Sequence, residues 1–238
     1  MTDSGRTGLA VAGAGALIAV AAVSLLVVVS RSAGSNGEWP RSGAQILADS
    51  RASLLSARSV HLSGTVVTGV RTDVYDITEG QGSAVGRITA DGAPVNVRVV
   101  GSDLYLQGRQ FVTTLAGPEA GARIGEGWVR GSLDDPALAR FAPLRLSGLA
   151  TLMTAGVQGG VDKGATSVHG GLTVGSLETG GSVTTVALDG TPYPQSLTAT
   201  VVTDEGEARA SLTLSGYDTP LPEVTAPGIA PPLPAPST

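Results

Sequence analysis

The spacing of hydrophobic residues changes near residue 60 from a helical to a strand-like pattern. Isoleucine and leucine residues share one side of a helix predicted over Ala44–Arg58, with Ser42 as its N-cap. Beyond it, short apolar or alternating runs separated by glycine and aspartate predict strands. The predicted strands are Val60–Val70, Ser83–Ala90, Pro94–Val100, Asp103–Gln107, Gln110–Leu115, Ala165–Val168, Gly171–Leu177, Ser182–Leu188, Gln195–Val202 and Ala208–Ser215.

A helical segment interrupts the strands in the middle of the chain. An Asp-Asp-Pro sequence at residues 134–136 is typical of a helix start, with aspartate as the cap and proline in the first turn. The apolar run to Ala155 contains Pro143, which must break it, so two short helices are predicted. The order of helix, strands, helical insert and strands predicts an α+β fold with an antiparallel sheet. Valines alternate with polar residues in Pro94–Val100, which indicates that one sheet face is exposed to water.

The two ends of the chain differ from this central domain, which we expect over residues 43–218. Leu9–Ser30 is an uncharged run of 22 residues, long enough to cross a bilayer as a helix. We favour a signal-anchor over residues 1–31; a cleaved signal peptide is the alternative, and both place the domain outside the cytoplasmic membrane. Residues 32–42 indicate a linker. Residues 219–238 hold seven of the fourteen prolines and predict an extended tail with no core to join.

Composition excludes several kinds of chemistry. The chain has a net charge of −5, no cysteine, a single lysine and two histidines. The absence of cysteine excludes disulfides, thiolate metal sites and cysteine nucleophiles. Because the net charge is negative and no basic cluster occurs, we expect no nucleic-acid partner.

The remaining candidates for catalysis are weak. His61 and His169 are isolated in the sequence, and no Gly-x-Ser-x-Gly motif marks a serine hydrolase. Gly156–Gly160 and Gly170-Gly171 lack the Gly-Lys-Ser/Thr ending of a phosphate-binding loop, so both predict turns. We therefore expect no enzymatic activity, no cofactor and no metal site; an envelope hydrolase would require an activity that depends on one of the histidines.

The order of several segments carries a family resemblance. The most specific pieces are a Gly-x-x-Leu-Tyr-Leu-x-Gly hairpin at Gly101–Gly108 and a closing pattern of Leu214, Ser215, Tyr217, Pro220, Pro222 and Pro227. Over residues 43–228 the chain resembles the actinobacterial cell-envelope lipoproteins of the LppX/LprG kind, which are related to the LolA/LolB lipoprotein carriers. Members usually carry a lipidated cysteine after the signal peptide. Here that region reads VVVSRSAGS, so attachment would depend on residues 9–30.

The resemblance implies a curved antiparallel half-barrel of LolA-like fold, with covering helices over an apolar cavity. It also implies binding of acylated lipids or glycolipids and their transport in the cell envelope. A long dry surface suits this ligand, because each buried methylene contributes about 0.8 kcal/mol. The tentative wall residues are Val66, Val97, Val99, Leu104 and Leu106 on strands, and Leu138, Phe141, Leu149, Leu152 and Met153 on the cover.

Two functional hypotheses remain open at this stage. In the first, the chain is a non-enzymatic lipid carrier whose ligand headgroup stays at the rim, near Arg98 or Arg109. In the second, the same fold has a closed core and acts as a structural or interaction module for another envelope protein. The proline-rich tail suits the second hypothesis, because an extended spacer gives reach.

Overall fold

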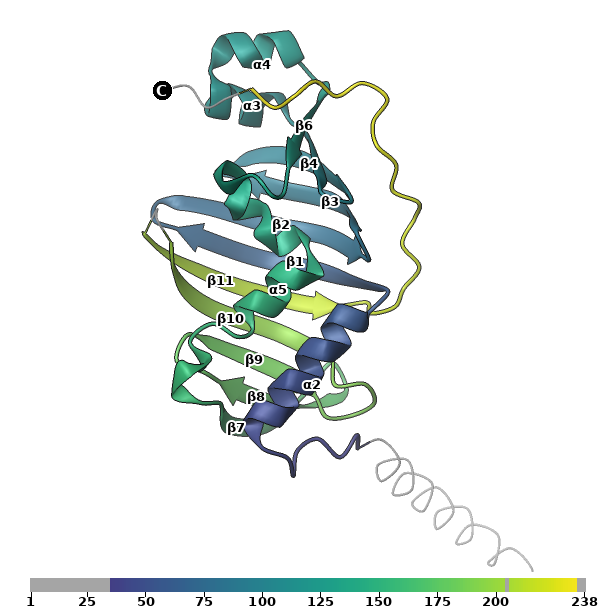
Figure 1. Cartoon of the computed structure of the whole chain (residues 1–238), viewed down its shortest axis with the longest axis vertical. Coiled ribbons are helices and arrows are strands. Elements are labelled where there is room, and N and C mark those ends of the chain that lie inside the picture. Colours follow the sequence, from purple (N-terminus) through teal and green to yellow (C-terminus); the bar gives the residue numbers. More distant parts are fainter. Residues whose placement is uncertain (1–34, 204–205, 235–238) are drawn as a thin grey trace, which may run out of the picture.

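The chain folds around one large open β-sheet (Figure 1), seen in a computed structural model that describes residues 35–203 and 206–234. The signal-anchor predicted over residues 1–31 lies outside this range. Among the described residues, no helix has the length and hydropathy needed to cross a bilayer.

Eleven antiparallel strands form the sheet in the order β6-β5-β4-β3-β2-β1-β11-β10-β9-β8-β7. The first and last strands of the domain, β1 and β11, pair with each other and join its two halves. The α+β class and the antiparallel sheet are confirmed. The strands are β1 Ser59–Thr68, β2 Arg71–Gly80, β3 Ser83–Ala90, β4 Ala93–Val100, β5 Asp103–Gln107, β6 Trp128–Ser132, β7 Asp162–His169, β8 Leu172–Glu178, β9 Ser182–Ala187, β10 Pro194–Thr203 and β11 Gly206–Ser215.

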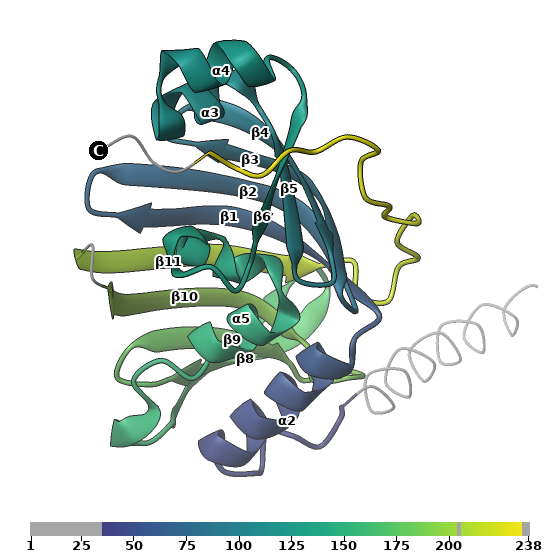
Figure 2. The same cartoon turned by 45° about the horizontal axis from the view of Figure 1, so that its top comes forward.

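Helices lie mainly on one face of the sheet, which curves around them (Figure 2). We call this the inner face. Helix α2 and the consecutive helices η1 and α5 cross it, whereas α3 and α4 lie at the end of the sheet next to β4–β6 (Figure 1). The helices are α2 Gly43–Ser56, α3 Arg109–Ala116, α4 Pro118–Ile124, η1 Pro136–Leu144, α5 Leu146–Leu152 and η2 Val157–Gly159.

Local sequence explains the helix boundaries. The Ser42 hydroxyl accepts a hydrogen bond from the Gln45 backbone N–H at 3.3 Å, and the Gln45 side chain accepts one from the Ser42 N–H at 3.1 Å. This capping box confirms the predicted start of α2. The predicted helix pair is also confirmed, since Pro143 lies near the end of η1 and Arg145 has extended backbone angles before α5.

The predicted strand Gln110–Leu115 is wrong. This segment forms α3, between Gly108 and Gly117, and buries Phe111 and Val112. Its β-branched residues favour a strand locally, but Leu115 follows Phe111 by four residues, a spacing that suits one side of a helix as well. Two strands were also absent from the prediction, β2 and β6.

Two glycines inside strands allow neighbouring strands to approach. Gly64 in β1 and Gly86 in β3 have φ angles of 141° and 156°. A Cβ atom would lie 2.2 Å from the Ser211 carbonyl oxygen at Gly64, and 2.2 Å from the Asp76 carbonyl oxygen at Gly86. Neither position can therefore hold a larger residue without a backbone shift, and glycines in strands often mark bends of this kind.

The proline-rich tail returns to the sheet, contrary to the prediction that it has no core to join. We call residues 219–234 the strap (yellow in Figure 1). The Arg130 N–H in β6 donates to the Pro231 carbonyl at 2.8 Å, and the Leu233 N–H donates to the Arg130 carbonyl at 2.7 Å. Leu233 also packs against the hydrophobic core. The side chain of Arg98 holds the middle of the strap by donating to the Thr225 carbonyl at 3.4 Å.

Candidate functional site

The inner face carries rows of apolar side chains that run across the strands. Strand register aligns one residue from each neighbouring strand in a row, and alternate residues face the helices. One row is Val60, Glu79, Ala84, Val99, Leu104 and Gly131; the next is Leu62, Ile77, Gly86, Val97, Leu106 and Val129. Apart from Glu79, both rows consist of apolar residues and glycine.

The structure brings the ten predicted wall residues together in one apolar cluster with their neighbours. Eight of them are at most 4% exposed, and Val66 and Leu152 are partly buried. The five strand residues share the inner face, and the other five lie opposite them. We call residues 136–153 (η1, α5 and Met153) the cover. Contact of these residues with a lipid stays a prediction.

A polar contact joins the cover to the sheet. Arg140 in η1 donates from Nε to the Asp73 carboxylate at 3.0 Å, and its Nη2 also contacts Asp73 and, at 3.4 Å, Asp91. Burial alone would lower the pKa of the Arg140 guanidinium, but hydrogen bonds and charge from the two aspartates outweigh burial and raise that pKa. The Tyr75 hydroxyl donates to the Arg140 carbonyl at 2.8 Å. This end of the cover is therefore held by charged and polar groups.

Among the described residues, one side-chain hydrogen bond to β9 holds the other end of the cover. The Ser182 hydroxyl donates to the Met153 carbonyl at 3.0 Å. Between the two ends the cover contacts the sheet through apolar side chains, which provide no directional bonds. Its position therefore depends on packing and on the anchors at its two ends.

Cavities follow the borders of the helices on the inner face. One of about 240 Å³ is lined by Leu55, Val99, Leu144 and Leu146, among others. A second of about 250 Å³ lies between Arg140 and α3, and a third of about 320 Å³ lies between α2 and the residues that follow α5. The first two cavities lie between helices and sheet, whereas the third is lined by helix and loop residues.

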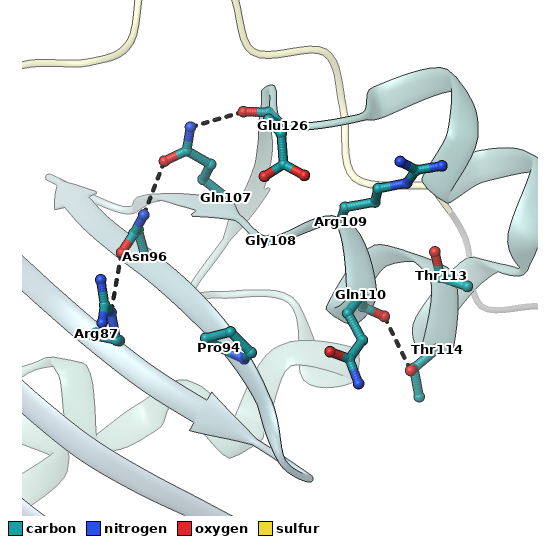
Figure 3. Close-up of a pocket in the computed structure, with 10 residues that line it drawn as sticks. All are labelled: Arg87, Pro94, Asn96, Gln107, Gly108, Arg109, Gln110, Thr113, Thr114 and Glu126. Atoms are coloured by element: carbon teal, nitrogen blue, oxygen red, sulfur yellow. Dashed lines mark hydrogen bonds between the residues drawn. The ribbon is translucent and has the colours of Figure 1, made fainter.

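A larger cavity with a largely polar lining, of about 700 Å³, lies beside the N-terminus of α3 (Figure 3). Its strand residues Arg87, Asn96 and Gln107 form one register row on the outer face of the sheet. Its wall contains a chain of hydrogen bonds from Arg87 to Asn96, from Asn96 to Gln107 and from Gln107 to the Glu126 carbonyl. These polar side chains are fixed by one another before any ligand is present. Thr114 lines this cavity and also the 250 Å³ cavity beside Arg140, so the two cavities adjoin.

The two arginines expected at the rim have different surroundings. Arg109 lines the polar cavity. Arg98 lies over the Trp128 ring, 4.9 Å from its centre, and donates to the strap. Only Arg109 is therefore placed next to a cavity that could receive a headgroup.

Sequence reasoning missed Glu79. It is fully buried on the inner face, and neither carboxyl oxygen has a hydrogen-bond partner. Burial raises the pKa of this carboxyl well above its usual value. Every second residue from Asp73 to Glu79 faces inward in β2. This alternation could have indicated Glu79 only if residues 71–80 had been predicted as a strand.

Neither histidine lines one of the cavities described above, although Asp76, the partner of His61, is the register neighbour of Arg87 in the wall of the 700 Å³ cavity. His61 Nε2 is 2.8 Å from the Asp76 carboxylate in an exposed pair on the opposite, outer face of the sheet. His169 is exposed at the end of β7. Asp134 accepts a hydrogen bond from Arg145 at 2.7 Å. Within residues 35–203 and 206–234, no cluster of three or more histidine or acidic residues could hold a metal ion. The turn predicted at Gly170-Gly171 is confirmed between β7 and β8.

Comparisons with known proteins give structural similarity alone. No family model and no curated protein matches the chain. Lipoprotein LppX of Mycobacterium tuberculosis is similar at 15% identity and a TM-score of 0.48, over 75% of this chain and 98% of that one. LprF from Mycobacterium bovis is similar at 17% identity and a TM-score of 0.49, over 82% of this chain and 99% of that one. These two structures belong to the group that the sequence resembles. Similarity at this level does not establish a function, which must be inferred from the contacts within this chain.

Proposed function

We propose that this protein binds acylated lipids on the inner face of its sheet and catalyses no reaction. The proposal is supported by two features of the inner face: its apolar residues and the helices that cover it. Apart from Glu79, its two rows are apolar across β1–β6, and the layer over them consists of short helices with cavities at their borders. An acyl chain needs a long apolar surface that can be uncovered, and this arrangement supplies one.

The burial of a lipid can offset the free energy lost when the cover is displaced from the sheet. Leucine, phenylalanine and methionine side chains of the cover fill the space above Val97, Val99 and Leu104. A lipid that displaced them would contribute about 0.8 kcal/mol for each methylene it buries, which offsets the lost packing of the cover. In this mechanism, release of Arg140 from Asp73 would free the end of η1.

The polar cavity suits the headgroup of such a lipid. An acyl chain that enters through the 250 Å³ cavity would contact Phe111 and Leu115 and then pass Arg140. Its headgroup would then pass Thr114 at the end of the sheet and lie in the 700 Å³ cavity next to Arg109. The hydrogen-bonded amides of Asn96 and Gln107 line the outer-face side of that cavity. Amide and guanidinium groups bind hydroxyl and phosphate oxygens, so a glycolipid or another lipid with a polar headgroup fits.

We place the protein on the extracytoplasmic side of the cytoplasmic membrane. The uncharged run Leu9–Ser30 supports this location, since it is long enough to span a bilayer. Attachment there would put the lipid site within reach of the membrane surface. Intact-mass measurement of the native protein reports directly whether this segment is retained.

The test is lipid binding by the full chain. Native mass spectrometry after expression in a lipid-containing host should show bound lipid, and a fluorescent acyl probe should bind in titration. Val66→Asp, which places a carboxylate on the inner face, should weaken probe binding at least about tenfold. The matched control is Val67→Asp, because Val67 is the next residue and faces the opposite, solvent-exposed side. No bound lipid and no probe uptake would overturn the proposal.

A second candidate is a closed-core module that binds an envelope protein. The dense packing of the eight buried wall residues favours it. The same titration separates the two, since a closed core would take up no probe and the Val66 and Val67 variants would behave alike.

A further inference from the structure

One acidic side chain lies in the apolar layer without a partner. Four buried side-chain atoms of the described residues lack a hydrogen bond, and two of them are the carboxyl oxygens of Glu79. The other two are hydroxyl oxygens, of Ser50 and Thr184. Each hydroxyl is one small neutral group, whereas the Glu79 carboxyl leaves two buried oxygens unpaired and would carry a charge if ionised. Buried polar groups in folded proteins are almost always paired, so Glu79 is an exception that needs a reason.

Glu79 interacts electrostatically with two tyrosines whose hydroxyls are hydrogen-bonded to other groups. The Tyr75 hydroxyl donates to the Arg140 carbonyl, and the Tyr217 hydroxyl donates to the Pro194 carbonyl. Arg140 is paired with Asp73. Among the described residues, none of these three side chains donates a hydrogen bond to the Glu79 carboxyl. Burial raises the pKa of the Glu79 carboxyl and so favours its neutral form, whose O–H is a hydrogen-bond donor.

Glu79 also lies in line with the proposed acyl site. Strand register places it in one row with Ala84, Val99 and Leu104, and the small side chain of Ala84 alone separates it from Val99. Val99 lines the 240 Å³ cavity, together with Gly80, the residue after Glu79. Glu79 is thus one residue along β2 from the wall of this cavity, whose lining also includes the polar residues Gln81, Ser83, Arg145 and Ser147.

We propose that Glu79 forms a polar subsite that donates a hydrogen bond to the ester carbonyl of a bound acyl chain. The inference rests on the proposed lipid-binding function. An ester carbonyl matches the site because it is an uncharged acceptor directly joined to hydrocarbon. A charged headgroup does not match, since its transfer into this layer would cost much more than one hydrogen bond returns. The subsite would therefore select ester-linked over ether-linked lipids of equal chain length.

The test compares a matched pair of lipids, a diacyl and a dialkyl glycerophospholipid with the same headgroup and chain length. Each lipid competes with a fluorescent acyl probe for binding to the full-length protein. The wild-type protein should bind the diacyl lipid about five- to tenfold more tightly, the value of one net hydrogen bond. Glu79→Leu should abolish this preference and leave the affinity for the dialkyl lipid unchanged or higher. Glu79→Gln, which keeps an N–H donor, should retain most of the preference.

The outcomes separate this inference from the function on which it rests. If the wild-type protein binds both lipids and Glu79→Leu keeps the same preference, the subsite is wrong and lipid binding stands. If the wild-type protein binds neither lipid, both proposals fail. Thermal unfolding of the three proteins excludes misfolding as the cause, because removal of an unpaired buried carboxyl should raise the melting temperature. A lipid amine that binds more tightly than the diacyl lipid, and only with Glu79 present, would also overturn the assignment of an ester.

Discussion

Arg140 in η1 and Asp73 in β2, 67 residues apart in the sequence, form a bidentate ion pair that joins the cover to the sheet. The Asp73 side chain is 8% exposed and that of Arg140 is 20% exposed. Removal of either partner would leave a charge in a largely dry position. The pair is thus both an anchor of the cover and the first contact that opening would break.

Substitution of Arg140 tests this anchor. Arg140→Ala should lower the free energy of unfolding by about 3 kcal/mol, because the Asp73 carboxylate loses its partner. It should also accelerate uptake of a fluorescent acyl probe. Urea unfolding and stopped-flow fluorescence measure the two effects. The control is Arg145→Ala, whose partner Asp134 is 64% exposed, so less than about 1 kcal/mol should be lost. Equal effects of the two variants would argue against an anchoring role.

The buried carboxyl of Glu79 predicts a distinctive pH dependence of stability. Burial raises its pKa in the folded protein above the ordinary value of 4.5. Between 4.5 and the raised value the folded state holds one more proton than the unfolded state, so stability falls as pH rises, by up to about 1.4 kcal/mol per pH unit. Glu79→Leu should remove this component. Urea unfolding at several pH values above 4.5 measures it, with exposed Glu223→Gln as the control. Parallel curves for wild type and Glu79→Leu would contradict the prediction.

The packing of the cover can be tested at Leu149, which is fully buried in α5. Leu149→Ala should lower the free energy of unfolding by about 2–5 kcal/mol through lost burial and the cavity left behind. Leu172→Ala is the control, since Leu172 in β8 is 38% exposed and should cost less than about 1 kcal/mol. Chemical denaturation provides both values. A cost at Leu149 as small as that at Leu172 would mean that the cover is not packed on the sheet.

The strap offers a matched pair of substitutions in one segment. Leu233→Asp should destabilise the protein by about 1–3 kcal/mol, because it places a carboxylate against the core next to β6. Ile229→Asp should change stability little, since Ile229 is 86% exposed. Melting temperatures of the two variants decide whether the strap is part of the domain. If both equal the wild-type value, the strap contributes nothing to folding.

Much of the fold could be read from local patterns, because they agree with the final environment. Ser42 and Gln45 supply the capping box of α2, and the predicted limits of Ser83–Ala90 and Asp103–Gln107 coincide with β3 and β5. Strand β2 was missed for the opposite reason. It turns two acidic residues inward, and what makes Asp73 acceptable there is an arginine far along the chain. No local pattern contains that information.

The candidate site was predicted in part. Alternation within Pro94–Val100 correctly separated Val97 and Val99 from the polar residues between them, and register then placed Leu104 and Leu106 on the same face. The sequence did not show how densely η1 and α5 would fill the space above them. The polar cavity could not be predicted either, because it is formed partly by α3, and the β-branched residues of that segment indicated a strand.

The pairing of the strap with β6 has a further consequence for the behaviour of the protein in a crowded environment. Strand β6 is the last strand at its end of the sheet, and such strands can recruit other chains into aggregates. Here the N–H and C=O of Arg130 are already occupied by the strap. The strap also lacks a backbone N–H at Pro231, Pro232 and Pro234, and so cannot donate from these positions to another polypeptide chain. The proline-rich end of the chain therefore leaves fewer backbone groups of this edge strand open to pairing with another chain.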